Sequence, residues 1–153
     1  HDLGVATLCV GRMHARGGAP ALGARPALDL VQLGHGLGRC DSPIEAAAGV
    51  ALARLGERWL ARSLERDPWS REELEWLQGR LTPLADARGD LSRTTASGAQ
   101  PVQTAAGIDV DAALARAAAQ ELCALASLAA TCEQKLERPT STEATDRTQG
   151  GVQ

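Results

Sequence analysis

Arginine returns at every fourth position in one stretch of the chain, RLGERWLARSLER at 54–66. The residues of this arginine ladder are Arg54, Arg58, Arg62 and Arg66. Residues four apart lie on nearly the same side of a helix, so a helix here would present a row of guanidinium groups. Guanidinium groups recognise carboxylates and phosphates through paired hydrogen bonds. The ladder is therefore a candidate binding surface for an anion or an acidic partner.

The alternative interpretation of the ladder is a solvated helix face. A row of core-type residues runs beside it with the same step, offset by two residues or about 200° around the helix. This row consists of Leu52, Gly56, Leu60 and Leu64. Like charges four residues apart repel by roughly 0.2–0.5 kcal/mol per pair, so we expect compensation from Glu57, Glu65 and the acids at 72–75. Compensated in this way, the ladder would be an ordinary solvated face, which is the interpretation that the sequence favours.

Histidine and cysteine give weaker candidates. His35 lies five residues before Cys40, a spacing that does not place two metal ligands on one helix face. His1 could chelate copper through its amine and ring nitrogens, but no spacing in the chain supports a complete site. The four cysteines lack metal-binding spacings, and we expect free, buried thiols in a reducing compartment. No catalytic motif is present, so we assign no catalytic residue, no metal and no cofactor.

The composition predicts an all-α fold. The 153 residues include three Trp and no Phe or Tyr, so Leu, Ala and Val must form most of the core, and Ala and Leu favour helix. The net charge of −3 and the lack of an aromatic stacking platform argue against a nucleic-acid partner. The uncharged apolar stretch at 122–132 is too short to span a bilayer. We therefore expect no membrane partner and a cytoplasmic location, unless a signal peptide has been removed.

Capping signals divide the first part of the chain into helices. A first helix at 1–16 should end at Gly17-Gly18, and a second should start at Pro26. Capping boxes at Ser42-Pro43-Ile44-Glu45 and at 70–73 predict the starts of a third and a fourth helix. Because about four residues join these two helices, we expect them to form an antiparallel hairpin.

The predicted organisation has four parts. Residues 1–88 should form a bundle of antiparallel helical hairpins, and residues 89–108, rich in Gly, Ser and Thr, a flexible linker. Residues 109–138 should form a long Ala-rich amphipathic helix able to pack on the bundle, and residues 139–153 a disordered tail.

The long C-terminal helix carries apolar residues at alternating steps of four and three. This interaction seam comprises Ala118, Leu122, Leu125, Ala129, Cys132 and Leu136. Such spacing is typical of a coiled coil with a second helix. It is equally typical of a helix in an ordinary bundle, which is the interpretation that we prefer.

These features predict a non-catalytic helical interaction or scaffold segment of a larger protein. The start at His1, without an initiator Met or an N-cap signal, favours a fragment. A protein partner or self-assembly would then use the amphipathic helices. The alternative function is a helical bundle that binds a small anionic ligand, or catalyses a reaction, at a site built from the arginine ladder and His35.

Overall fold

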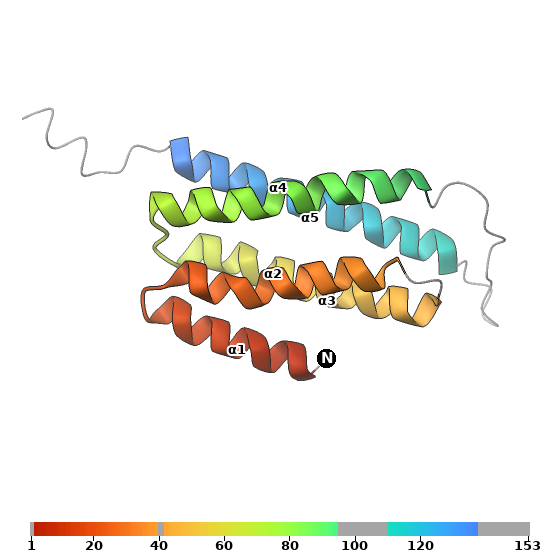
Figure 1. Cartoon of the computed structure of the whole chain (residues 1–153), viewed down its shortest axis with the longest axis horizontal. Helices are drawn as coiled ribbons and strands as arrows, with labels where there is room; N and C mark the ends of the chain where they lie inside the picture. The colour runs from red at the N-terminus through yellow and green to blue at the C-terminus, as the bar shows by residue number, and fades with distance from the viewer. Residues whose placement is uncertain (1, 40–41, 95–109, 138–153) are drawn as a thin grey trace, which may run out of the picture.

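Helix-favouring residues dominate the chain, and helices account for its described structure (Figure 1). The computed structural model describes residues 2–39, 42–94 and 110–137. These residues form five helices and no strand. The helices are α1 (Asp2–Arg16), α2 (Pro20–Leu37), α3 (Pro43–Arg66), α4 (Arg71–Thr94) and α5 (Val110–Glu137). The predicted all-α fold is confirmed.

Local capping chemistry starts α3 and α4 as expected. The Ser42 Oγ accepts the Glu45 N–H at 3.5 Å, which makes Ser42 the N-cap of α3. At α4 the capping box is complete, because the Glu73 N–H donates to the Ser70 Oγ at 3.2 Å and the Ser70 N–H donates to the Glu73 carboxylate at 3.0 Å. Burial raises the pKa of Glu73, but the hydrogen bonds from Ser70 and from the Ala21 N–H outweigh it and lower the pKa overall. The ionised carboxylate therefore joins the start of α4 to the start of α2.

Two helix boundaries differ from the prediction. Helix α2 begins at Pro20, directly after a turn at Gly18 (φ 82°), and Pro26 lies inside it. Although an interior proline removes one helical hydrogen bond, the added turns bury Gly23 against α1, so tertiary packing decides the boundary.

Helix α4 also runs further than predicted. It continues through Pro83 to Thr94, so residues 89–94 of the predicted linker are helical. Residues 95–108 of that linker and the predicted tail at 139–153 lie outside the described residues.

The helices form two antiparallel hairpins, α2–α3 and α4–α5, which lie side by side (Figure 1). Helix α1 packs antiparallel to α2 at the outer edge of this arrangement. Helices α3 and α4 lie diagonally across the bundle and do not pack along each other, so the hairpin predicted between them is wrong. The connection at 67–70 carries α4 to α2 instead, where Glu73 accepts the Ala21 N–H at 3.3 Å.

The core consists mainly of leucines from α2, α3, α4 and α5. Its fully buried large side chains include Leu60, Leu64, Leu77, Leu81, Leu125 and Cys132. Burial raises the pKa of the Cys132 thiol to about 11, so this thiol is neutral at physiological pH. Cys9, Cys123 and Cys132 are free thiols, but Cys9 and Cys123 are exposed, so the prediction of buried thiols is wrong for these two. Cys40 lies outside the described residues.

Helix α5 is long and apolar enough to cross a membrane over Ala112–Glu137, by length and composition alone. Within the bundle, however, Leu125, Leu128 and Cys132 pack into the core. A core helix of a bundle in water meets the same two criteria, so no membrane role is derived from α5.

Helix α2 lies so close to its neighbours that backbones touch at glycines. A Cβ added at Gly34 would lie 2.5 Å from the Gly49 carbonyl oxygen and 2.7 Å from the Ala53 nitrogen. A Cβ at Gly11 of α1 would lie 2.5 Å from the Gly23 carbonyl oxygen. Side-chain carbons do not approach backbone atoms this closely, so the helix packing requires glycine at these positions.

Two glycines on the same helix test this requirement. We expect Gly34→Ala to lower the free energy of unfolding by about 1–3 kcal/mol through overpacking. A Cβ at Gly36 would meet nothing within 4 Å, so Gly36→Ala should leave stability unchanged or raise it by up to about 1 kcal/mol. Urea denaturation of both variants measures the difference. Equal changes in the free energy of unfolding for Gly34→Ala and Gly36→Ala would contradict the close α2–α3 contact.

Candidate functional site

The arginine ladder lies on the side of α3 that faces away from the core. Arg58, Arg62 and Arg66 are exposed, whereas Leu60 and Leu64 of the neighbouring row are fully buried. The predicted opposition of the two rows is therefore confirmed.

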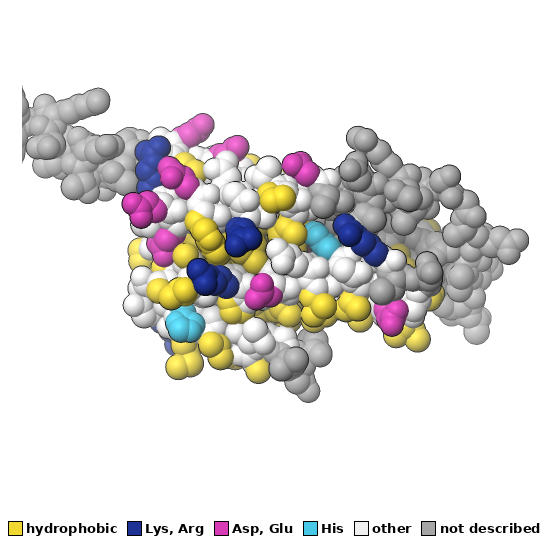
Figure 2. All heavy atoms as spheres, in the orientation of Figure 1, with side chains coloured by type: hydrophobic (Ala, Val, Ile, Leu, Met, Phe, Trp, Pro, Cys, Tyr) yellow, Lys and Arg dark blue, Asp and Glu magenta, His cyan; other side chains and the backbone are white. Residues whose placement is uncertain are grey.

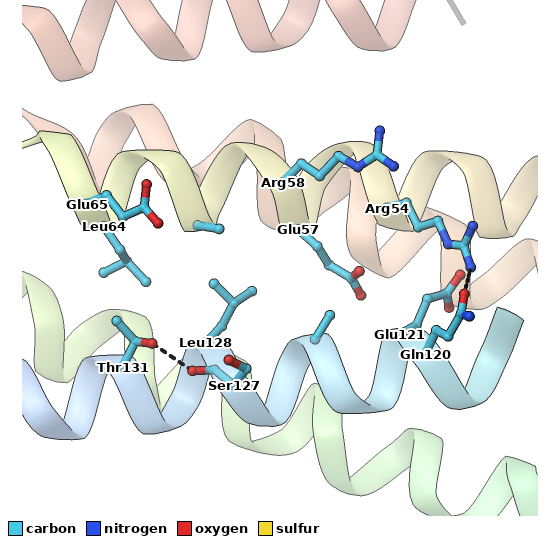
Figure 3. A pocket seen from close by; sticks show the side chains of 12 residues that line it. Arg54, Glu57, Arg58, Leu64, Glu65, Gln120, Glu121, Ser127, Leu128 and Thr131 are labelled. Carbon is cyan, nitrogen blue, oxygen red and sulfur yellow. Dashed lines mark hydrogen bonds between the residues drawn. The ribbon is translucent and has the colours of Figure 1, made fainter.

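The four side chains of the arginine ladder do not lie on one continuous surface. Arg54, at its start, turns toward α5, where its Nη2 donates a hydrogen bond to the Gln120 Oε1 (Figure 3). The other ladder residues line a groove between α1 and α3.

The groove has a volume of about 410 Å³ and collects arginines from both helices. Helix α1 contributes Arg12 and Arg16, four residues apart, which sequence analysis did not identify as site residues. Their spacing repeats that of the ladder, but only the packing of α1 beside α3 shows that they share a surface with it. We call this surface the arginine groove. Its arginines are Arg12, Arg16, Arg58, Arg62 and Arg66.

None of the groove arginines forms an ion pair with a described carboxylate. The expected compensation of Arg62 by Glu65 is absent, because Glu65 lines a cavity on the α5 side of the helix. Two acids of α4 have other partners: Glu75 pairs with Arg71 at 3.1 Å, and Glu73 belongs to the capping box. The prediction of a compensated ladder is therefore wrong for the part that lines the groove.

One acidic residue, Asp67, lines the arginine groove, and its carboxylate accepts the Ser63 hydroxyl hydrogen bond at 2.6 Å. Arg16 and Arg66 lie in the last turns of α1 and α3, where the helix dipole stabilises positive charge. Arg12, Arg58 and Arg62 lie before the last turn. The groove thus carries a local excess of positive charge in a chain whose net charge is −3.

Arginines do not gather in the same way on the face drawn in Figure 2. The face drawn in Figure 2 shows basic and acidic side chains interspersed among apolar and neutral ones. The arginine groove differs from that face in its concentration of positive charge.

A second cavity, of about 470 Å³, lies on the other flank of α3, against α5. Glu57 and Glu121 extend into it from the two helices, and Arg54 and Arg58 also line it (Figure 3). Both carboxylates are almost completely buried, with exposed fractions of 5% and 1%. Helix α3 therefore has an acidic cavity on one flank and the arginine groove on the other.

The other sequence candidates do not join these sites. Leu125 and Cys132 of the interaction seam are fully buried in the core of the same chain, and Leu136 packs against that core. The side chain of Leu122 lies outside the described part of the structure. His35 is buried on α2 and lines neither cavity. Among the described residues, no three His, Cys, Asp or Glu side chains form a metal-binding group.

Comparison with known proteins does not identify the chain, because no family model, curated protein or solved structure matches it. The chemistry of the arginine groove therefore supplies the argument for function.

The uncompensated charges should cost stability. Arg62 has ladder neighbours four residues away on both sides, so Arg62→Gln should raise the free energy of unfolding by roughly 0.4–1 kcal/mol at low salt. Arg116→Gln on α5 is the control, since this exposed arginine has alanine and glutamine at those positions. Denaturation at low and high ionic strength should show the gain only for Arg62→Gln and only at low salt. A loss of stability on Arg62→Gln would contradict the uncompensated groove.

Proposed function

We propose that this chain is a non-catalytic helical binding segment that holds an anionic group of its partner in the arginine groove. The observation that carries the proposal is that five arginines from two helices line one groove without an ion-pair partner among the described carboxylates. An exposed ladder on one helix would be an ordinary solvated face. A concave surface to which a second helix adds further arginines favours recognition of an anion.

The groove has the size and the donors that anion recognition requires. Its volume of about 410 Å³ is within the range of small-molecule sites in proteins. Each guanidinium presents a planar fork that matches two oxygens of a carboxylate or phosphate. Repulsion among the arginines would be relieved by a bound anion, which adds to the favourable free energy of binding.

The lining supports binding more than catalysis. Ser63 is the hydroxyl residue of the groove, and it is buried and already donates its hydrogen bond to Asp67. No histidine or cysteine lines the groove, so the residues of the lining provide no activated nucleophile. An enzymatic site combining the ladder with His35 is less well supported, because His35 does not line the groove.

Stabilisation by pyrophosphate tests this proposal. We expect thermal unfolding of the chain to shift upward with pyrophosphate, relative to sodium chloride of equal ionic strength. Binding to the folded state alone adds about 2.7 kcal/mol of stability at a ligand concentration of 100 Kd. The double variant Arg58→Gln/Arg62→Gln should lose most of this stabilisation.

The matched control is Arg80→Gln/Arg116→Gln, which removes the same charge from exposed positions on α4 and α5. This variant should keep the stabilisation by pyrophosphate. An equal loss in the two double variants would mean that pyrophosphate responds to net charge, and it would reject the groove as a specific site.

A further inference from the structure

The lining of the arginine groove changes in polarity along its length. Helices α1 and α3 are each antiparallel to α2, so they run parallel to each other and their C-terminal ends lie at the same end of the groove. The glycines of α1 give the alignment: a Cβ at Gly4 would lie 3.4 Å from the Leu55 side chain, and one at Gly11 would lie 3.4 Å from the Trp59 ring. The early residues of both helices therefore form one end of the groove, and Arg16 and Arg66 belong to the other.

The first end of the groove holds its apolar lining, with Arg58 beside it. Leu8, Leu55 and Trp59 line it, and the last two are only partly buried, so part of their apolar surface faces the groove. From Leu55 to Arg66 the helix rises by about 16 Å. A ligand that fills this length would meet apolar side chains first and then guanidinium groups.

We propose that the ligand of the groove is a phosphate monoester of an apolar alcohol, with its phosphate among Arg16, Arg62 and Arg66 and its apolar body against Leu55 and Trp59. This inference rests on the proposed function and specifies the anion. A carboxylate offers one bidentate edge, whereas a phosphate monoester is a dianion with three acceptor oxygens that several guanidinium groups can share. The number of unpaired arginines therefore favours phosphate.

The position of the apolar surface favours a single soluble molecule over a membrane surface. The leucines and Trp59 line the groove between two helices, together with the arginines. The exposed apolar residues of α1, including Val10 and Met13, do not line it. A phosphorylated lipid in a bilayer would instead need apolar side chains at the rim that enters the membrane.

Calorimetric titration of the full chain with three probes tests the inference. Hexyl phosphate has both the phosphate group and the apolar chain of the proposed ligand. Inorganic phosphate has only the phosphate group, and 1-hexanol has only the apolar chain. Each methylene moved from water to an apolar contact strengthens binding roughly fourfold. We expect hexyl phosphate to bind at least about tenfold more tightly than inorganic phosphate, and 1-hexanol to show no measurable binding.

Two variants separate the parts of the site. Arg62→Gln should weaken the binding of both phosphates, whereas Leu55→Ser should weaken the binding of hexyl phosphate and leave inorganic phosphate unchanged. If Leu55→Ser does not fold, ethyl phosphate and hexyl phosphate on the unchanged chain make the same comparison. The longer chain should then bind more tightly.

The contrary outcomes are distinguishable. Equal affinity for hexyl phosphate and inorganic phosphate would overturn this inference and leave the proposed anion-binding function standing. Binding to vesicles that contain phosphatidic acid, without binding to monomeric hexyl phosphate, would overturn it in favour of a membrane surface. No binding of any phosphate, pyrophosphate included, would overturn the inference and the proposed function together.

Discussion

The close backbone contact between α2 and its two neighbours is the constraint on which the rest of the structure depends. Gly11 meets Gly23 at the α1–α2 contact, and Gly34 meets Gly49 at the α2–α3 contact. Because α1 and α3 both pack directly on α2, these contacts set the separation of α1 from α3. Helix α2 contributes no side chain to the lining of the arginine groove, yet it determines the width of that groove.

Helix α3 contributes both to the hydrophobic core and to the lining of the two cavities. One side carries Leu60 and Leu64 into the core, one flank turns Glu57 toward α5, and the exposed side lines the arginine groove. This division places five arginines along one groove in which Asp67 is the one acidic lining residue, at a cost in stability. A fold that tolerates such repulsion on one concave surface is typical of a binding site, where stability and function oppose each other.

Features that depend on neighbouring residues could be predicted from the sequence, and features that depend on helix packing could not. The capping box at Ser70 and the burial of Leu60 follow from spacing within one helix, and both were predicted correctly. The start of α2 was misplaced, because contact of Gly23 with α1 outweighs the preference of Pro26 for a first helical position. Likewise the pair of arginines on α1 shows no relation to the ladder until the two helices are seen to be neighbours.

The proposed function requires that the arginines of the groove bind an anion together. The most direct measurement is the NMR spectrum of the arginine Nε–Hε groups during titration with inorganic phosphate. We expect the signals of Arg16, Arg62 and Arg66 to move first and to saturate with one common dissociation constant, while the signals of Arg80 and Arg116 hardly move. Shifts of similar size at all exposed arginines, without saturation, would contradict a specific site in the arginine groove.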